Sequence, residues 1–284
     1  MNQEAQGSAS VSSGTTPASI EPAGQDAIRL ADFRPVACDG LRRIGNANDG
    51  GYVVPMNAVA AADALLSFGL SHDWSFERDF TAHNPRVLVH CYDHTVTVLS
   101  ALRYSIGQLA RFAVRWNGRY LRKSLAWIDY LRFFRGSNVH FRQRIWRDRS
   151  DNSATVADAF ERLGGKRQIF VKMDIEGSEY RVLDDLIARS DDIVALAIEF
   201  HDVDILAARF NALVQKLKHG FHIVHIHGNN LGGVTPSGFA MAPEITFLNK
   251  RFFASPPRPS SLKYPVAGLD SPNYPGLPDI EFSF

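Results

Sequence analysis

The chain has 284 residues, of which 45% are apolar and 21% are charged, and its formal net charge is +1. This composition is typical of a soluble globular protein and excludes a fibrous or highly charged disordered chain. No run of about 18 apolar residues occurs, which excludes a membrane-spanning helix of that length. The only cysteines, Cys38 and Cys91, lie far apart in the sequence. They predict two free thiols and a cytoplasmic location.

The chain is expected to divide into three parts. Residues 1–26 are rich in Ser, Gly, Ala, Thr and Pro and have neither a basic start nor an apolar core, so they predict a disordered leader and not a signal peptide. Residues 27–253 carry the strand and helix patterns of one domain. Residues 254–284 hold seven of the fourteen prolines and predict a tail that packs on or near this domain.

Seven short apolar runs predict β-strands, and most are separated by helical patterns. The strands are expected at Ala64–Gly69, Arg86–Asp93, Asn138–Ile145, Gln168–Glu176, Asp192–Phe200, Phe221–Asn229 and Glu244–Lys250. Helices are expected at Ser153–Leu163, with Ser153 as its cap, at Ser178–Arg189 and at Asp204–His219. The alternation predicts a mostly parallel α/β sheet with helices on both faces. The last two strands have no helix between them, which predicts that the final strand is antiparallel.

A helical insertion is expected at about residues 95–135, before the third strand, where it would cover one side of the site. Between Arg111 and Arg149 there are eleven Lys or Arg residues against two Asp residues, a net charge of +9. This segment is either a solvated basic helix or a docking surface, through 111–149, for an anionic membrane or an acidic glycan. No nucleic-acid-binding module is recognised in the sequence.

A single glycine turn follows the first strand. Gly69 would let the backbone pass close to a ligand, and Asp93 ends the next strand, 24 residues later, close to the spacing at which an acid binds ribose hydroxyls. Asp73 would attract a cofactor that carries an ammonium and a sulfonium and would repel a pyrophosphate. The turn therefore favours S-adenosylmethionine over a nicotinamide cofactor. The expected cofactor-binding residues are Ser67, Gly69, Ser71, Asp73, Trp74 and Asp93.

Several segments between about 41 and 280 resemble a known family. The segment VKMDIEGSEYRVL at 171–183 resembles the K-I-D-V-E-G-x-E signature of FkbM-type S-adenosylmethionine-dependent methyltransferases. The segments SFGLSHDWSFE, CYDHT, EFH and HIHGNN are similar to the methyltransferase-like branch of that group. The resemblance implies the Rossmann-like class I methyltransferase fold, a seven-stranded, mostly parallel sheet whose last strand is antiparallel. It also implies S-adenosylmethionine-dependent methyl transfer, commonly to a hydroxyl. The chain departs from the family at the first motif, which keeps only Gly69.

Acidic residues and a histidine follow the fourth and fifth predicted strands, where the ligands of open α/β sheets bind. The expected catalytic residues are His201, Asp174, Glu176 and Glu199. His201 is the candidate general base because its ordinary pKa lies near neutrality. It could equally be a structural histidine. The acceptor is expected to contact Asp49, Tyr52, His227 and Asn229.

Three alternatives remain open. A divalent metal could bind Asp174, Glu199 and His201, or His225 and His227, although ordinary hydrogen bonding is favoured for these side chains. The favoured function is an O-methyltransferase acting on a hydroxyl of a glycan, a lipid-linked sugar or a secondary metabolite. The alternative is a non-catalytic protein that binds a small molecule or glycan on a degenerate methyltransferase fold.

Overall fold

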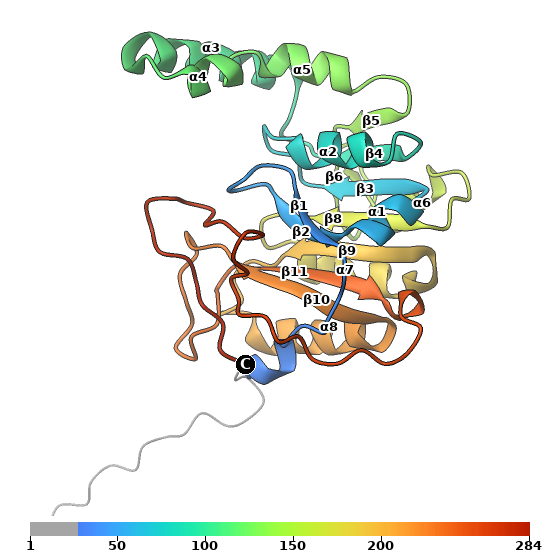
Figure 1. Ribbon diagram of the computed structural model, residues 1–284. Coiled ribbons are helices and arrows are strands. Elements are labelled where there is room, and N and C mark those ends of the chain that lie inside the picture. The colour runs from blue at the N-terminus through green and yellow to red at the C-terminus, as the bar shows by residue number, and fades with distance from the viewer. Residues whose placement is uncertain (1–27) are drawn as a thin grey trace, which may run out of the picture.

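The computed structural model describes residues 28–284, apart from the side chains of residues 119, 122, 123 and 126. The predicted leader at 1–26 lies outside the described residues. A seven-stranded sheet in the order β10-β11-β9-β8-β3-β4-β5 forms the centre of the domain (Figure 1). Its strands are β3 (Ala64–Phe68), β4 (Leu88–Tyr92), β5 (Asn138–Phe141), β8 (Ile169–Met173), β9 (Ile193–Glu199), β10 (Phe221–Gly228) and β11 (Pro243–Asn249).

The direction of the strands identifies the fold. β11 lies between β9 and β10 and is antiparallel to both, whereas β5, β4, β3, β8 and β9 pair in parallel. The first parallel strand, β3, lies in the middle of the five parallel strands, and the chain moves outward from it in both directions. This order, with the last strand inserted in reverse beside the edge, is the class I methyltransferase arrangement. The predicted fold class is therefore confirmed.

Helices cover both faces of the sheet because alternate side chains of the central strands enter two separate cores. Leu66 and Phe68 of β3 pack in one core, whereas Leu65 packs in the other. Side chains of α6 (Val156–Glu161), α7 (Glu179–Ile187) and α8 (Ala207–Gly220) fill the first core. The second core is closed by α1 (Met56–Ala61), α2 (Ser75–His83) and a hairpin of β1 (Leu41–Ile44) and β2 (Tyr52–Pro55).

Two local predictions were wrong. The third predicted strand is divided: β5 joins the main sheet, whereas β6 (Arg144–Ile145) pairs with β7 (Ser153–Ala154) in a separate two-stranded sheet. Ser153 therefore lies in a strand and does not cap α6. The cap is Thr155, whose side chain accepts a hydrogen bond from the amide of Asp158 while Asp158 accepts one from the amide of Thr155. This reciprocal pair is a capping box, and it fixes the start of the helix two residues later than the pattern of apolar residues suggested.

The inserted segment forms a helical arm at one edge of the domain (Figure 1). It consists of α3 (Val98–Arg115), α4 (Gly118–Lys123) and α5 (Ala126–Phe133), and α3 packs on both of the shorter helices. The helical insertion expected at about 95–135 is thus one long helix followed by two short ones, which are separated at residues 124–125. Within the described part of the chain, no helix is both long and apolar enough to cross a membrane.

The proline-rich tail, residues 254–284, follows the surface of the domain and contributes to its first core. Tyr264, Ile280 and Phe282 are buried there. The side-chain amide of Asn230 donates hydrogen bonds to three carbonyl oxygens of the tail, those of Tyr274, Leu277 and Pro278. The tail thereby reaches the end of β10, on the same side as the predicted acceptor site.

Candidate functional site

The carboxyl ends of β3 and β8 meet at Gly69 and Asp174. These strands pair in parallel, with Phe68 opposite Met173, so the next residue of each strand lies beside the other. Gly69 has φ +86°, and a Cβ built on it would lie 1.7 Å from the carbonyl oxygen of Asp174. Only glycine fits this close backbone approach. The glycine turn and the first predicted catalytic acid are therefore parts of one structure.

Asp93, at the end of β4, holds the turn that follows β3. One carboxylate oxygen accepts hydrogen bonds of 2.9 Å from the amides of Leu70 and Ser71, and the other accepts from the amide and the hydroxyl of Thr95, at 2.6 Å each. Burial alone would raise the pKa of Asp93, but these hydrogen bonds lower it below its ordinary value. Both oxygens thus have partners within the chain, and a ribose contact would use the lone pairs that remain.

The other predicted cofactor residues divide into two groups. Ser71 and Asp73 lie in the turn itself, and Asp73 accepts a hydrogen bond from the amide of Ser75. Ser67 is fully buried and donates to the buried carboxylate of Glu77 at 2.5 Å. Trp74 is also buried, and its indole N–H donates to Asp129 of α5 at 2.7 Å. Ser67 and Trp74 therefore support the turn and the arm from within the core.

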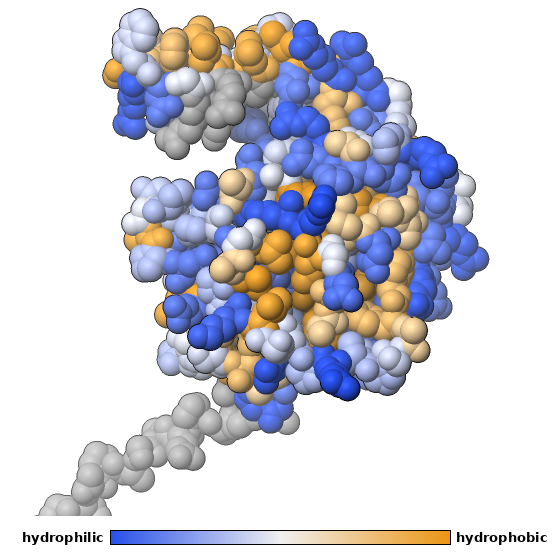
Figure 2. Space-filling model, viewed as in Figure 1, coloured by the Kyte–Doolittle hydropathy of each residue, from blue (hydrophilic) through white to orange (hydrophobic). Residues whose placement is uncertain are grey.

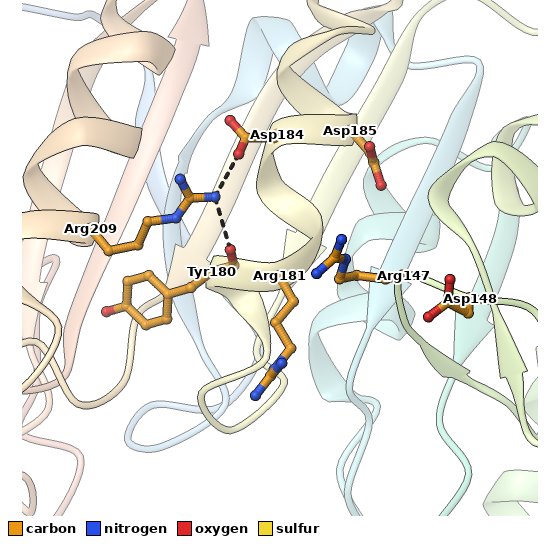
Figure 3. Close-up of a pocket in the computed structure, with 7 residues that line it drawn as sticks. All are labelled: Arg147, Asp148, Tyr180, Arg181, Asp184, Asp185 and Arg209. Carbon is orange, nitrogen blue, oxygen red and sulfur yellow. Dashed lines mark hydrogen bonds and ion pairs between the residues drawn. The ribbon is translucent and has the colours of Figure 1, made fainter.

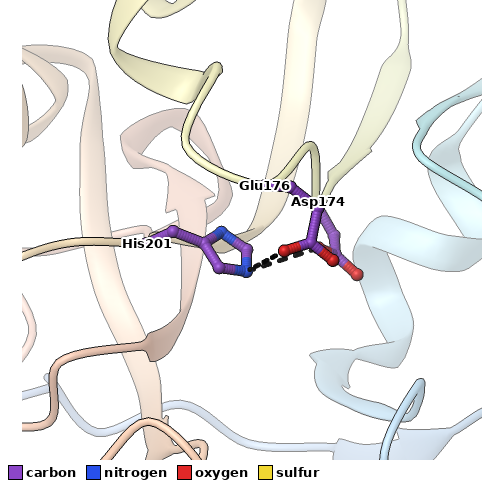
Figure 4. A group of neighbouring side chains, drawn as sticks. All are labelled: Asp174, Glu176 and His201. Atoms are coloured by element: carbon purple, nitrogen blue, oxygen red, sulfur yellow. Dashed lines mark ion pairs between the residues drawn. The ribbon is translucent and has the colours of Figure 1, made fainter.

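Three carboxylates surround the outer nitrogen of His201, and Figure 4 shows two of them, Asp174 and Glu176. The Nε2 atom lies 3.4 Å from Glu176 and 3.9 Å from both Asp174 and Glu199. Glu176 is 85% exposed, whereas the imidazole is 18% exposed, so solvent reaches the cluster from the side of Glu176. The four predicted catalytic residues, which come from the ends of β8 and β9, thus lie together.

The inner nitrogen of His201 is held by a residue that the sequence analysis did not single out. Glu179, at the start of α7, is buried, and its Oε1 lies 3.2 Å from Nδ1 of His201. Burial alone would lower the pKa of His201, but the hydrogen bond to Glu179 and the charges of Glu179, Glu199 and Asp174 raise it to about 9. At neutral pH the imidazole of the free protein is therefore protonated and balances part of the acidic charge.

Glu199 connects the acidic cluster to the predicted acceptor residues. Its two oxygens accept hydrogen bonds from the side-chain amide of Asn229 at 2.8 Å and from the Tyr52 hydroxyl at 3.4 Å. Burial, together with the nearby charges of Asp174 and Glu244, raises the pKa of Glu199 well above its ordinary value. Asp49 lies near the same acids, since burial and the Asp174 and Glu244 charges raise its pKa too.

Lys172 is a buried cation of this region, and the sequence pattern did not predict a role for it. Its Nζ donates to the carbonyl oxygen of Gly69 at 2.8 Å and lies 3.6 Å from Asp174. Burial would lower the pKa of Lys172, but Asp174, Glu77 and Glu199 raise it. Lys172 and the imidazoliums of His201 and His227 are three cations, fewer than the six acidic side chains around them, which are Asp49, Asp174, Glu176, Glu179, Glu199 and Glu244. The site is therefore suited to a cationic ligand.

Both ring nitrogens of His227 are bound, one by β11 and the other by the tail. Its Nδ1 lies 3.0 Å from Glu244 and its Nε2 lies 3.0 Å from Asp279, and the side chain is 1% exposed. His225 has one bound nitrogen, since its Nε2 lies 2.9 Å from Asp270 while its buried Nδ1 has no hydrogen-bond partner. Because no ring nitrogen of His227 is left for an acceptor, we do not include it among the acceptor-contacting residues. Because both nitrogens of His227 are bound, these two histidines do not offer a shared metal site.

The other metal hypothesis named Asp174, Glu199 and His201, whereas the three ligands that the structure groups include Glu176 in place of Glu199. Ligand atoms of Asp174, Glu176 and His201 lie within 4.8 Å of one another. A metal needs neutral imidazole, however, and the pKa of His201 is raised to about 9. The proton on Nε2 already supplies positive charge between the same carboxylates, so an ion would have to displace it.

A hollow of about 490 Å³ opens beside α7 (Figure 3). It is lined by Arg147, Asp148, Tyr180, Arg181, Asp184, Asp185 and Arg209. Asp184 pairs there with Arg209 at 2.5 Å and with Lys216 at 2.7 Å. The hollow includes none of the predicted catalytic residues.

No protein-family model matches the chain, and no curated protein matches it. Among solved structures it is similar to Methanococcus jannaschii fibrillarin, a pre-rRNA processing protein, with 9% identity over 68% of each chain and a TM-score of 0.37. A Streptococcus pneumoniae protein described as a tRNA (m1A22) methyltransferase, solved with S-adenosyl-L-methionine, is 11% identical over 68% of this chain and 69% of its own, with a TM-score of 0.35. Precorrin-6y C5,15-methyltransferase of Geobacter metallireducens is 12% identical over 69% and 86%, with a TM-score of 0.35. Likeness of this size concerns the fold alone, and the fold assignment rests on the strand order.

Proposed function

We propose that the chain is an S-adenosylmethionine-dependent methyltransferase that acts on a hydroxyl. The observation that carries the proposal is the meeting of Gly69, Asp174 and His201 at the carboxyl ends of β3, β8 and β9. Ligands of open α/β sheets bind at this edge, next to the first strand of the sheet. The excess of carboxylates there suits a ligand with an ammonium and a sulfonium group.

The residues near the turn after β3 would hold the cofactor. Gly69 lets the backbone approach closely, Asp93 fixes the amides of the turn, and Asp73 adds negative charge. When bound, S-adenosylmethionine supplies a methyl group on a positively charged sulfur. The neighbouring carboxylates Asp174 and Glu199 would stabilise that positive charge, which a pyrophosphate-binding turn would not.

The acceptor hydroxyl would lie on the other side of the cluster, among Asp49, Tyr52, Asn229 and His201. Transfer to a hydroxyl requires a group that takes the proton, and Nε2 of His201 is the candidate base. In the free protein this nitrogen is protonated at neutral pH. A bound cation beside Asp174 and Glu199 would offset the charges that raise the pKa of His201 and would release the proton. Glu179 would keep the ring oriented throughout.

The resemblance of the segment at 171–183 to FkbM-type proteins supports a glycan, a lipid-linked sugar or a secondary metabolite as the acceptor class. The amide of Asn229 and the carboxylate of Asp49 are hydrogen-bonding groups of the kind that bind sugar hydroxyls. We propose that the transfer needs no metal, since the imidazolium of His201 supplies positive charge beside Asp174 and Glu176 in the free protein. We propose a cytoplasmic location on the basis of the two free thiols, Cys38 and Cys91.

The alternative is a non-catalytic binding protein, and one observation favours it: both carboxylate oxygens of Asp93 already bind the chain itself. Calorimetric titration with S-adenosylmethionine and S-adenosylhomocysteine separates the two. Uptake of both ligands, weakened in Asp174→Asn, supports the methyltransferase. A folded protein that takes up neither ligand contradicts it. The acceptor would be sought by mass spectrometry of glycans and lipids for the loss of a methyl increment in a deletion strain.

A further inference from the structure

The arm of α3, α4 and α5 exposes an apolar stripe that the rest of the described chain does not cover. Five of its members lie on α3 and share one side of the helix, because they recur at alternating intervals of three and four residues, and the sixth is the residue that ends the helix. They are Leu99, Leu102, Ile106, Leu109, Ala113 and Trp116. Ile106 is 60% exposed and Trp116 is 82% exposed. Figure 2 shows apolar side chains gathered along the outer side of the arm, with hydrophilic ones beside them.

The side of α3 that packs on α4 and α5 lies about a quarter of a turn from the stripe, and it is the less apolar of the two. Ala101, Ser105 and Gln108 are buried there, and the Ser105 hydroxyl accepts a hydrogen bond from the amide of Trp127. A helix that belongs only to its own domain normally buries its most apolar side. The arrangement in α3 indicates that its apolar side contacts an apolar partner outside the domain, either a protein or a lipid bilayer.

The charge of the arm distinguishes between a second copy of the chain and a lipid bilayer as this partner. Residues 98–135 contain eight Lys or Arg residues and one acid, Asp129, a net charge of +7. Asp129 is engaged with Trp74 and Arg78 of the domain. Two copies of this arm packed together would bring two sets of positive charge into contact, which disfavours self-association. An anionic lipid surface attracts such a segment, at about 1 kcal/mol for each basic residue near it.

We propose that the arm docks on an anionic phospholipid bilayer, with α3 lying in the interface. The 18 residues of α3 span about 27 Å, and the apolar stripe faces outward along this whole length. The Leu and Ile side chains insert between the acyl chains, Trp116 lies at the headgroup level, and the arginines contact the phosphates. This is peripheral attachment, since no described helix can cross the bilayer.

Docking of the arm would also place the candidate site near the bilayer, an inference that rests on the proposed function. His72, in the turn after β3, stacks on Tyr104 of α3 at 4.7 Å between ring centroids. The arm therefore borders the turn that would hold the cofactor. A protein held on the bilayer through α3 would place its acceptor site near the headgroups, and this favours a lipid-linked acceptor.

The test is co-sedimentation of the full chain with phosphatidylcholine vesicles, with and without about 30% phosphatidylglycerol, at low and high salt. Wild type is expected to sediment with the anionic vesicles, and salt is expected to weaken this binding. Ile106→Gln with Leu109→Gln is expected to weaken it about tenfold or more. Arg103→Gln with Arg111→Gln is expected to weaken it about 25-fold, or about fivefold for each arginine.

Matched controls remove the same groups elsewhere. Leu262→Gln with Leu277→Gln replaces two other exposed leucines, and Arg42→Gln with Arg258→Gln removes two other exposed arginines. Both control variants are expected to bind as wild type does. All these residues are at the surface, so circular dichroism is expected to show unchanged folding.

Three results would overturn the proposal. They are no sedimentation with either vesicle, equal loss in the control variants, or a wild-type dimer in light scattering that becomes a monomer in Ile106→Gln with Leu109→Gln. The last result would assign the stripe to a second copy of the chain. Because the assay measures only lipid binding, its outcome is independent of whether the protein binds S-adenosylmethionine.

Discussion

Glu179 and His201 form one unit that joins the ends of two strands. The same oxygen of Glu179 lies 3.2 Å from Nδ1 of His201 and accepts the amide hydrogen of Ile175 at 3.0 Å. The buried carboxylate thereby connects the loop after β8 with the residue that follows β9. With Nδ1 fixed, Nε2 faces the remaining carboxylates. A carboxylate that orients the second nitrogen of a histidine is a common support for a catalytic or ligand-binding imidazole.

Glu179→Gln is expected to lower the pKa of His201 from about 9 towards its ordinary value, because the variant removes the charge that contributes most to the increase. Titration of the His201 ring protons by NMR measures this. Glu176→Gln is the control. The Glu176 carboxylate lies 3.4 Å from Nε2 but is 85% exposed, so solvent screens its charge and the pKa of His201 is expected to fall less. An equal fall in both variants would contradict the role given to Glu179.

His201→Ala is expected to reduce turnover by a factor of about 10² to 10⁴ while leaving the affinity for S-adenosylhomocysteine near that of wild type. The base must be neutral, so the wild-type kcat/KM is expected to rise with pH as His201 loses its proton, up to about pH 9. Initial rates over this pH range and calorimetry with the variant are the measurements. A folded His201→Ala protein with near-full turnover would eliminate His201 as the base.

Gly69→Ala is expected to destabilise the fold by roughly 3 kcal/mol or more, because the new Cβ would collide with the backbone of Asp174 at a positive φ. Gly136→Ala is the matched control. Gly136 also has a positive φ, +62°, but a Cβ there meets nothing within 4 Å, so only the backbone conformation costs energy, about 1 kcal/mol. Urea unfolding of both variants measures the difference. Similar losses would show that the contact with Asp174 is relieved by a shift of the turn.

Asp279→Asn is expected to destabilise the protein at pH 6 and to have little effect above pH 9. Burial would lower the pKa of His227, but Glu244, Asp270 and Asp279 raise it to about 9. Protonated His227 therefore stabilises the fold fully below about pH 6.5, and this contribution disappears as the pH rises to about 9. At pH 6 the loss is expected to be on the order of 1–3 kcal/mol.

Urea unfolding of Asp279→Asn at both pH values is the measurement. Glu281→Gln, which changes an exposed acid of the same tail, is expected to show no such dependence. An equal loss of stability at pH 6 and above pH 9 would contradict this prediction. It would mean that Asp279 stabilises the tail independently of the charge on His227.

Treatment with EDTA is expected to leave both activity and S-adenosylhomocysteine affinity unchanged. The proton on His201 already neutralises part of the charge of Asp174 and Glu176, where a divalent ion would bind. Activity measured after chelation, with and without added Mg²⁺ or Mn²⁺, is the check. Loss of activity that Mg²⁺ restores would reinstate the metal hypothesis.

The periodicity of the sequence was sufficient for the sheet. The apolar runs located all seven main strands, and Asp174, Glu199 and His201 were predicted at strand ends because the runs stop immediately before them. The boundary of β5 was wrong because Arg144 and Ile145 continue the strand pattern, and only their pairing with β7 separates them from it. The pattern of residue types along the chain cannot show where one strand ends and the next begins when only the neighbouring strand changes.

The sequence by itself determined the α/β fold, the residues at the carboxyl edge and the basic character of the inserted segment, because these depend on the spacing of residue types along the chain. Only the tertiary structure decided that Glu179 orients His201, that Lys172 binds the carbonyl of Gly69 and that the tail occupies His227. Each of these contacts joins segments that are remote in sequence. Tertiary packing also turned the apolar side of α3 outward, since the side that a helix buries is set by the surface available to it.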